Sequence, residues 1–150
     1  MLTKNKILAE ILDKNLEELA QAEQLSGETI KQSVEKGSMV VLANPHHGNV
    51  LPTLIGQPAR IKVNANIGTS PFINDLNLEL KKVQVAKCAG AHTIMDLSTA
   101  GDLDEIRGLI IEHSPLPVGT VPIYSVAQKY IGQGQDHSKM SVQEIFEEIH

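Results

Sequence analysis

Apolar residues in the first part of the chain recur at the spacing of an amphipathic helix. Between positions 4 and 22 they lie three or four residues apart with charged residues between them, which predicts a helix with one buried face. Ser26 is a typical helix cap and Gly37 a typical helix stop, so we expect a second helix between them. Residues 39–42 are all apolar and predict a short strand, and the segment 52–58, bounded by prolines, is expected to be irregular or a hairpin.

From residue 60 onward the pattern changes to strands and helices that alternate. The expected elements are, in order, strand 61–67, helix 77–89, strand 92–97, a helix from Asp102 to just before Ser114, strand 118–123, a loop over 130–140 and a helix over 141–150. Alternation of this kind is typical of a parallel α/β sheet with right-handed crossover connections. We therefore expect a helical and short β region over 1–59 and an α/β unit over 60–150, with the boundary near Arg60.

The composition excludes several classes of function. The 150 residues, 41% hydrophobic and 21% charged, are enough for about one globular domain. A net charge of −5 argues against nucleic acid as the main partner, because neutralising phosphates needs a basic surface. No apolar run approaches the roughly 20 residues of a membrane span, and the start of the chain has no signal-peptide pattern, so no membrane partner and a cytoplasmic location are expected. The single cysteine, Cys88, is expected to be a small buried residue on a helix.

Three residues share a regular spacing that points to a site. Asn66, Met95 and Tyr124 each stand near the end of an expected strand, and successive members of the set are 29 residues apart. Equal spacing places equivalent positions of successive strand–helix units at the same end of a parallel sheet, where α/β folds build their sites. The residue types alone leave two roles open for each: Asn66 binds a polar ligand or satisfies loop backbone, Met95 contacts a ligand or fills the core, and Tyr124 offers its hydroxyl or packs.

Other candidate chemistry is weaker. Ser98 and Thr99 are candidates to cap the following helix, and the amides of the loop that contains them are candidates to bind an anion such as phosphate; the two roles can coexist. His46 and His47 are adjacent, so on an extended segment their side chains point to opposite faces, and we expect loop residues rather than metal ligands. The sequence has neither a nucleophile elbow nor a dinucleotide-binding fingerprint.

Three ordered motifs resemble one known family. They are KVNANIGTS at 62–70, MDLST at 95–99 and PLPVGTVPIY at 115–124, and the similarity extends over most of the chain. They resemble the phosphomethylpyrimidine synthase (ThiC) family of thiamine biosynthesis. The resemblance implies a (β/α)8 barrel, a homodimer, and a radical S-adenosylmethionine lyase that converts 5-aminoimidazole ribonucleotide into 4-amino-5-hydroxymethyl-2-methylpyrimidine phosphate.

The same resemblance implies roles for the three spaced residues. Residues that match Asn66, Met95 and Tyr124 line the family's substrate pocket, so Asn66 would hydrogen-bond the ribotide, Met95 would pack on it and Tyr124 would offer its hydroxyl. The family also implies a 4Fe–4S cluster, S-adenosylmethionine and zinc. The matching ligands are not found among these residues, and Cys88 cannot replace the cysteines of a cluster, so no catalytic residue and no metal ligand is assigned to this chain.

The number of expected βα units indicates only part of a barrel. Three units neither close a barrel, which takes about eight, nor cover both faces of a parallel sheet. We therefore expect the first three βα units of a truncated (β/α)8 barrel. They would form the N-terminal, substrate-binding part of a longer synthase, and this part is expected to be inactive by itself. Two alternatives stay open: a relative that makes 5-hydroxybenzimidazole from the same ribotide, and a non-catalytic, stand-alone fragment or interaction module.

Overall fold

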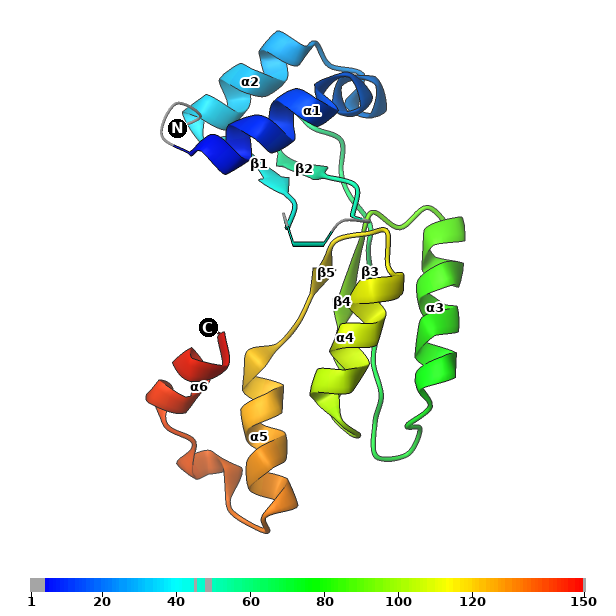
Figure 1. The fold of residues 1–150 in the computed structure, drawn as a ribbon, viewed down its shortest axis with the longest axis vertical. Coiled ribbons are helices and arrows are strands. Elements are labelled where there is room, and N and C mark those ends of the chain that lie inside the picture. Colours follow the sequence, from blue (N-terminus) through cyan, green and yellow to red (C-terminus); the bar gives the residue numbers. More distant parts are fainter. Residues whose placement is uncertain (1–4, 45, 48–49, 150) are drawn as a thin grey trace.

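The computed structural model describes residues 5–44, 46–47 and 50–149, which form two small sheets and a set of helices (Figure 1). In order, the elements are α1 (Lys6–Glu23), α2 (Gly27–Lys36), β1 (Met39–Leu42), β2 (Thr53–Gly56), β3 (Asn64–Ile67), α3 (Leu76–Cys88), β4 (Thr93–Asp96), α4 (Leu103–His113), β5 (Val118–Gly119), α5 (Pro122–Gly132), the 3-10 helix η1 (His137–Lys139) and α6 (Val142–Ile149). The outermost positions of the first and last expected helices, residues 4 and 150, lie outside the described residues. No helix in the described part of the chain combines the length and hydrophobicity that a membrane span requires.

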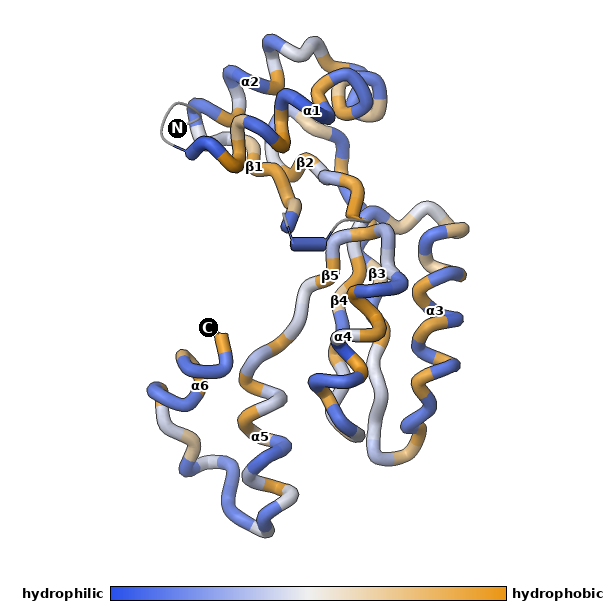
Figure 2. The backbone as a smooth tube through the Cα atoms, viewed as in Figure 1, coloured by the Kyte–Doolittle hydropathy of each residue, from blue (hydrophilic) through white to orange (hydrophobic). Residues whose placement is uncertain are grey.

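The N-terminal elements pack two helices against a hairpin. β1 and β2 pair antiparallel, with Met39 opposite Gly56. The sequence predicts residues 52–58 to be either irregular or part of a hairpin, and the structure shows the hairpin. Apolar positions recur along α1, α2 and both strands in Figure 2, and one face of each helix contributes to a buried cluster. The buried members of this cluster are Leu12, Leu19, Ile30, Val34, Met39 and Leu54. The two helices predicted for this part of the chain are confirmed.

Ser26 caps α2 as its position in the sequence predicts. Its hydroxyl oxygen accepts a hydrogen bond from the backbone N–H of Thr29 at 3.1 Å. We expect Ser26→Ala to lower the free energy of unfolding by about 1 kcal/mol, because this N–H loses its acceptor. Ser26→Gly is the control and should cost only about a few tenths of a kcal/mol. Equal unfolding midpoints in urea for the wild type and Ser26→Ala would contradict the capping role.

The second sheet contains β3, β4 and β5, which are parallel and adjacent in that order, as expected for an α/β unit. Helices α3 and α4 lie on one side of this sheet and share a second buried cluster with it (Figure 1). The buried members of this cluster are Ile67, Val83, Ile94, Leu103, Ile106 and Ile110. Counting the partly buried residues packed against them, the first cluster extends to Ala59 and the second begins at Ala65. The domain boundary near Arg60 stays a prediction.

The third parallel strand is shorter than predicted, and a helix replaces its end. The predicted strand 118–123 is wrong beyond Gly119, because α5 begins at Pro122. Proline fits the first helical position, since its fixed φ suits a helix and its missing N–H would have no helical partner there. α5 continues to Gly132, so the predicted loop over 130–140 begins too early.

Cys88 is exposed, so the prediction of a buried cysteine is wrong. It is the last residue of α3, and the buried positions of that helix are Glu79 and Val83. Cys88 follows Val83 by five residues, and at about 100° per residue this turns its side chain away from the buried face.

Candidate functional site

The face of the parallel sheet opposite α3 and α4 is polar. Ile67 of β3 and Ile94 of β4 are buried toward the helices, so Asn66 and Met95 lie on the other face. Asn66 pairs with Met95 in the register of the two strands, which places the two residues side by side. Asn66 is exposed and Met95 is half-buried. The spacing between these two residues therefore corresponds to one complete strand–helix unit.

Hydrogen bonds along this face orient the amide of Asn66. Asn64 donates from Nδ2 to Oδ1 of Asn66 at 3.1 Å, and the Thr93 hydroxyl donates to Oδ1 of Asn64 at 2.8 Å. Asn66 thus uses its amide oxygen within the protein and presents its NH2 group as a donor. This arrangement suits a ligand that carries hydrogen-bond acceptors.

Asn66 and Met95 are neighbours in the sheet, but Met95 and Tyr124 are not. The neighbour of Met95 on β5 is Gly119, where an added Cβ would lie 3.2 Å from the Met95 sulfur, so the glycine leaves room for the methionine side chain. Tyr124 lies instead in the first turn of α5, where its N–H donates to the carbonyl of Val121 at 3.0 Å and the residue is 38% exposed. The prediction that Tyr124 follows the end of a strand is therefore wrong, and the structure does not bring it into register with the other two.

Polar contacts attach α5, the helix of Tyr124, to its neighbours. Gln128 donates from Nε2 to the carbonyl of Gly101 at 2.7 Å, which links α5 to the loop after β4. Lys129 donates to Glu148 of α6 at 2.7 Å. This hydrogen bond raises the pKa of Lys129 and lowers the pKa of Glu148, so both groups are held in their charged forms at neutral pH.

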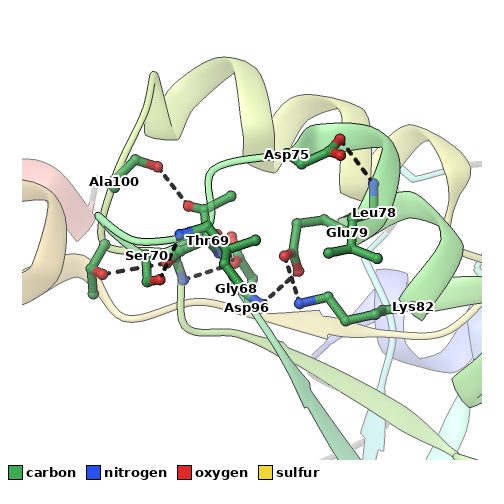
Figure 3. A network of polar contacts seen from close by, with 12 residues as sticks. Gly68, Thr69, Ser70, Asp75, Leu78, Glu79, Lys82, Asp96 and Ala100 are labelled. Carbon is green, nitrogen blue, oxygen red and sulfur yellow. Dashed lines mark hydrogen bonds and ion pairs between the residues drawn. The ribbon is translucent and has the colours of Figure 1, made fainter.

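A network of polar contacts holds the loop that follows β3 (Figure 3). Glu79 of α3 is fully buried, and its Oε2 accepts a hydrogen bond from the backbone N–H of Gly68 at 2.7 Å. Its Oε1 lies 2.5 Å from Nζ of Lys82. On the other side of the loop, the N–H of Thr69 donates to the Ser98 hydroxyl at 3.0 Å. The loop after β3 is thus fixed both to α3 and to the loop after β4.

Ser98 joins this network instead of capping a helix. Its hydroxyl donates to Oδ1 of Asp96 at 2.5 Å, and both residues are 2% exposed. Asp102 caps α4 by accepting the N–H of Glu105 at 3.0 Å, so the interpretation of Ser98 and Thr99 as caps is wrong. Their own N–H groups bond within the protein, Ser98 to Asp96 and Thr99 to the loop after β3, so neither is free to bind a phosphate.

Sequence reasoning missed the two buried carboxylates of this network. Glu79 lies on a helix and Asp96 on a strand, each on the side that packs against the core. The one signal that could have identified them is an acidic residue at a position where the hydrophobic period expects an apolar one.

A pocket of about 310 Å³ opens beside the polar face of the sheet. Met95, Asn64 and Thr93 line it from the sheet, and Asn44 and His47 line it from the segment after β1. Asn64 and Thr93 are the first residues of their strands, so the pocket lies toward the amino ends. Its lining residues include neither of the other two predicted site residues.

The described residues offer no donor set for the metal groups that the sequence resemblance implies. No cluster of three or more His, Cys, Asp or Glu side chains in this part of the chain could hold a metal ion. Nε2 of His47 lies 3.4 Å from Nδ2 of Asn44. Structural zinc takes four ligands and an iron–sulfur cluster several cysteines, so the described residues do not fit either group.

Three parallel strands with helices α3 and α4 packed on one face make this chain an α/β protein. Residues 3–150 match the sequence profile of the Radical SAM ThiC family, and the chain belongs to this family.

Individual relatives of this chain carry the name phosphomethylpyrimidine synthase. The phosphomethylpyrimidine synthase of Thermococcus kodakarensis is 41% identical over 139 residues, which are 93% of this chain and 32% of that protein. The phosphomethylpyrimidine synthase of Carboxydothermus hydrogenoformans is 45% identical over 142 residues, again 93% of this chain and 32% of that protein. The chain thus spans about a third of the length of these relatives.

Proposed function

We propose that this chain is the N-terminal part of a phosphomethylpyrimidine synthase of thiamine biosynthesis. The reaction would be the radical S-adenosylmethionine-dependent conversion of 5-aminoimidazole ribonucleotide into 4-amino-5-hydroxymethyl-2-methylpyrimidine phosphate. Support comes from the family match over residues 3–150 and from identities of 41% and 45% to proteins that carry this name. The enzyme would be cytoplasmic and homodimeric.

In this proposal the parallel sheet is the first part of a (β/α)8 barrel. Its strands are adjacent in chain order, β3-β4-β5, whereas open doubly wound sheets reverse their strand order at a switch point. Both α3 and α4 pack on the same face of the sheet, as barrel helices do. These two observations support the strands of the first three βα units and the helices of the first two.

The side-by-side placement of Asn66 and Met95 on the polar sheet face is the observation that carries the proposed substrate site. Asn66 would donate its NH2 group to an acceptor of the ribotide, Met95 would pack on the ligand, and Tyr124 would contribute its hydroxyl from α5. Residues outside this chain would hold the 4Fe–4S cluster and zinc, because the described residues offer no donor set that fits either metal group. S-adenosylmethionine would bind together with the cluster.

The test is ribotide binding by the complete synthase that carries this segment. We expect Asn66→Ala and Tyr124→Phe each to weaken the binding of 5-aminoimidazole ribonucleotide by about three- to tenfold, because each removes one hydrogen bond. Isothermal titration calorimetry gives the dissociation constants, and turnover gives kcat/KM.

Two matched variants serve as controls for these substitutions. Tyr130→Phe removes a hydroxyl from the same helix as Tyr124, but that hydroxyl donates to Glu144, so ribotide affinity should be unchanged. Asn77→Ala truncates an exposed asparagine on α3 and should also leave affinity unchanged. Wild-type affinity in both Asn66→Ala and Tyr124→Phe would contradict these roles, and 5-hydroxybenzimidazole as the product in mass spectrometry would contradict the proposed reaction.

A further inference from the structure

Glu79 is a buried charge that faces the loop leaving the candidate site. The residue is 0% exposed, which is unusual for a carboxylate unless it is paired. Its two oxygens contact the Gly68 N–H and the Lys82 ammonium (Figure 3). Lys82 is on the same helix and is 39% exposed, so it compensates the charge from the solvent side. The hydrogen bond to Gly68 is the contact by which Glu79 reaches beyond its own helix.

Gly68 is the point at which the loop passes close to the neighbouring strand. It follows Asn66 by two residues and has a φ of 146°. An added Cβ would lie 2.6 Å from both the Leu97 carbonyl carbon and the Ser98 nitrogen. The backbone therefore passes against the start of the loop after β4, while its N–H is turned toward α3, where Glu79 accepts it at 2.7 Å.

The other side of the loop is bound just as firmly. Thr69 is 2% exposed, its N–H donates to Ser98, and its hydroxyl donates to the carbonyl of Ala100 at 2.5 Å. Two opposed sets of hydrogen bonds thus fix the direction in which the chain leaves Asn66. Replacing a buried ion pair by apolar packing is often neutral or stabilising, so stability alone does not require Glu79.

We propose that Glu79 is a positioning residue for the substrate site: through the N–H of Gly68 it fixes the loop and thereby the direction of the Asn66 amide toward the ribotide. This inference rests on the proposed function, because the ribotide is the ligand that Asn66 would meet. Glu79 itself makes no contact with the polar face of the sheet, since it lies on the helix side.

The experiment compares three variants of the complete synthase. Glu79→Leu removes the acceptor for Gly68 and should lower kcat/KM for 5-aminoimidazole ribonucleotide by roughly 10- to 100-fold, as expected for a displaced binding group. Glu79→Gln keeps an oxygen that can accept the Gly68 N–H and should restore most of the activity. Val83→Ala is the control: it truncates a fully buried residue one turn along the same helix, so it should lower Tm but leave KM unchanged.

Amide hydrogen exchange of residues 68–70 provides a readout that needs no ligand. Exchange there should be faster in Glu79→Leu than in the wild type or in Glu79→Gln. If Glu79→Leu does not fold, Glu79→Asp takes its place, because it keeps the charge but is shorter by one methylene.

The possible results separate the two proposals. Wild-type KM and wild-type exchange in Glu79→Leu would overturn the positioning role, and so would a loss of ribotide affinity in Val83→Ala as large as that in Glu79→Leu. If the wild-type synthase does not bind the ribotide, this result contradicts the proposed function. It also contradicts the inference that the ribotide is the ligand near the positioned loop. Exchange at residues 68–70 then still decides whether Glu79 fixes that loop.

Discussion

Replacing Lys62 by methionine should lower the free energy of unfolding by about 3–5 kcal/mol, because it leaves a buried carboxylate without its countercharge. Nζ of Lys62 lies 2.8 Å from Oε1 and 2.9 Å from Oε2 of Glu23, and the two side chains are only 7% and 4% exposed. Glu23 is the last residue of α1, and it also accepts the N–H of Arg60 at 2.8 Å. The pair therefore ties the N-terminal helices to the segment that leads into β3. Urea unfolding followed by circular dichroism measures the loss.

The surface pair of Lys31 and Asp13 provides the matched control. Its ions are 2.7 Å apart, but the side chains are 40% and 65% exposed. Lys31→Met should therefore lower the free energy of unfolding by no more than about 1 kcal/mol. Adding Glu23→Gln to Lys62→Met should recover part of the loss, since the uncompensated charge disappears. Equal losses for Lys31→Met and Lys62→Met would contradict the importance of burial.

The ion pair also predicts how stability depends on pH. Burial by itself would raise the pKa of Glu23, but the hydrogen bonds from Lys62 and from the Arg60 N–H outweigh it and hold the pKa below its ordinary value of 4.5. Because the folded-state pKa is the lower one, the contribution of Glu23 is complete above about pH 4.5 and is lost as the pH falls through the folded-state pKa. The stability difference between the wild type and Lys62→Met should therefore narrow in acid. A difference that stays constant from about pH 7 to about pH 3 would contradict this.

Local signals in the sequence predict most of the secondary structure. Ser26 marks the start of α2 because a helix cap needs only a hydrogen bond to a residue three positions away. The same kind of signal fails at Pro122, since a proline suits both the end of a strand and the first position of a helix. The apolar residues Ile123, Val126 and Tyr130 repeat at helical spacing and could have indicated that a helix follows.

The candidate site is predictable only where it follows the period of the fold. Asn66 and Met95 are one strand–helix unit apart, so their spacing anticipates their neighbouring places in the sheet. The contact between Glu79 and Gly68 joins a helix side chain to a loop amide, and no repeating pattern marks it. Glu23 pairs with a lysine 39 residues later, which depends on how the N-terminal helices pack against the rest of the chain.

Replacing Gly68 by alanine should have the second large effect, lowering the free energy of unfolding by about 3–5 kcal/mol. Two penalties add at this position. A φ of 146° is unfavourable for any residue with a side chain, and the new Cβ would lie 2.6 Å from the backbone of Leu97 and Ser98. Relief of this contact requires the loops after β3 and β4 to move apart, which would break the hydrogen bond between Thr69 and Ser98. Urea unfolding measures the loss, and ribotide affinity of the complete synthase should fall with it.

Gly37→Ala separates the two penalties, because Gly37 has a positive φ of 77° but an added Cβ there meets nothing within 4 Å. This control variant should lose about 1–2 kcal/mol from backbone strain alone. Gly37 ends α2 and lies outside the β3 and β4 loops, so its replacement should also leave ribotide affinity unchanged. The excess loss in Gly68→Ala then measures how tightly the two loops are packed. If both variants lose the same stability, the close approach of the loops at Gly68 does not contribute, and the loop that follows Asn66 is free to adjust.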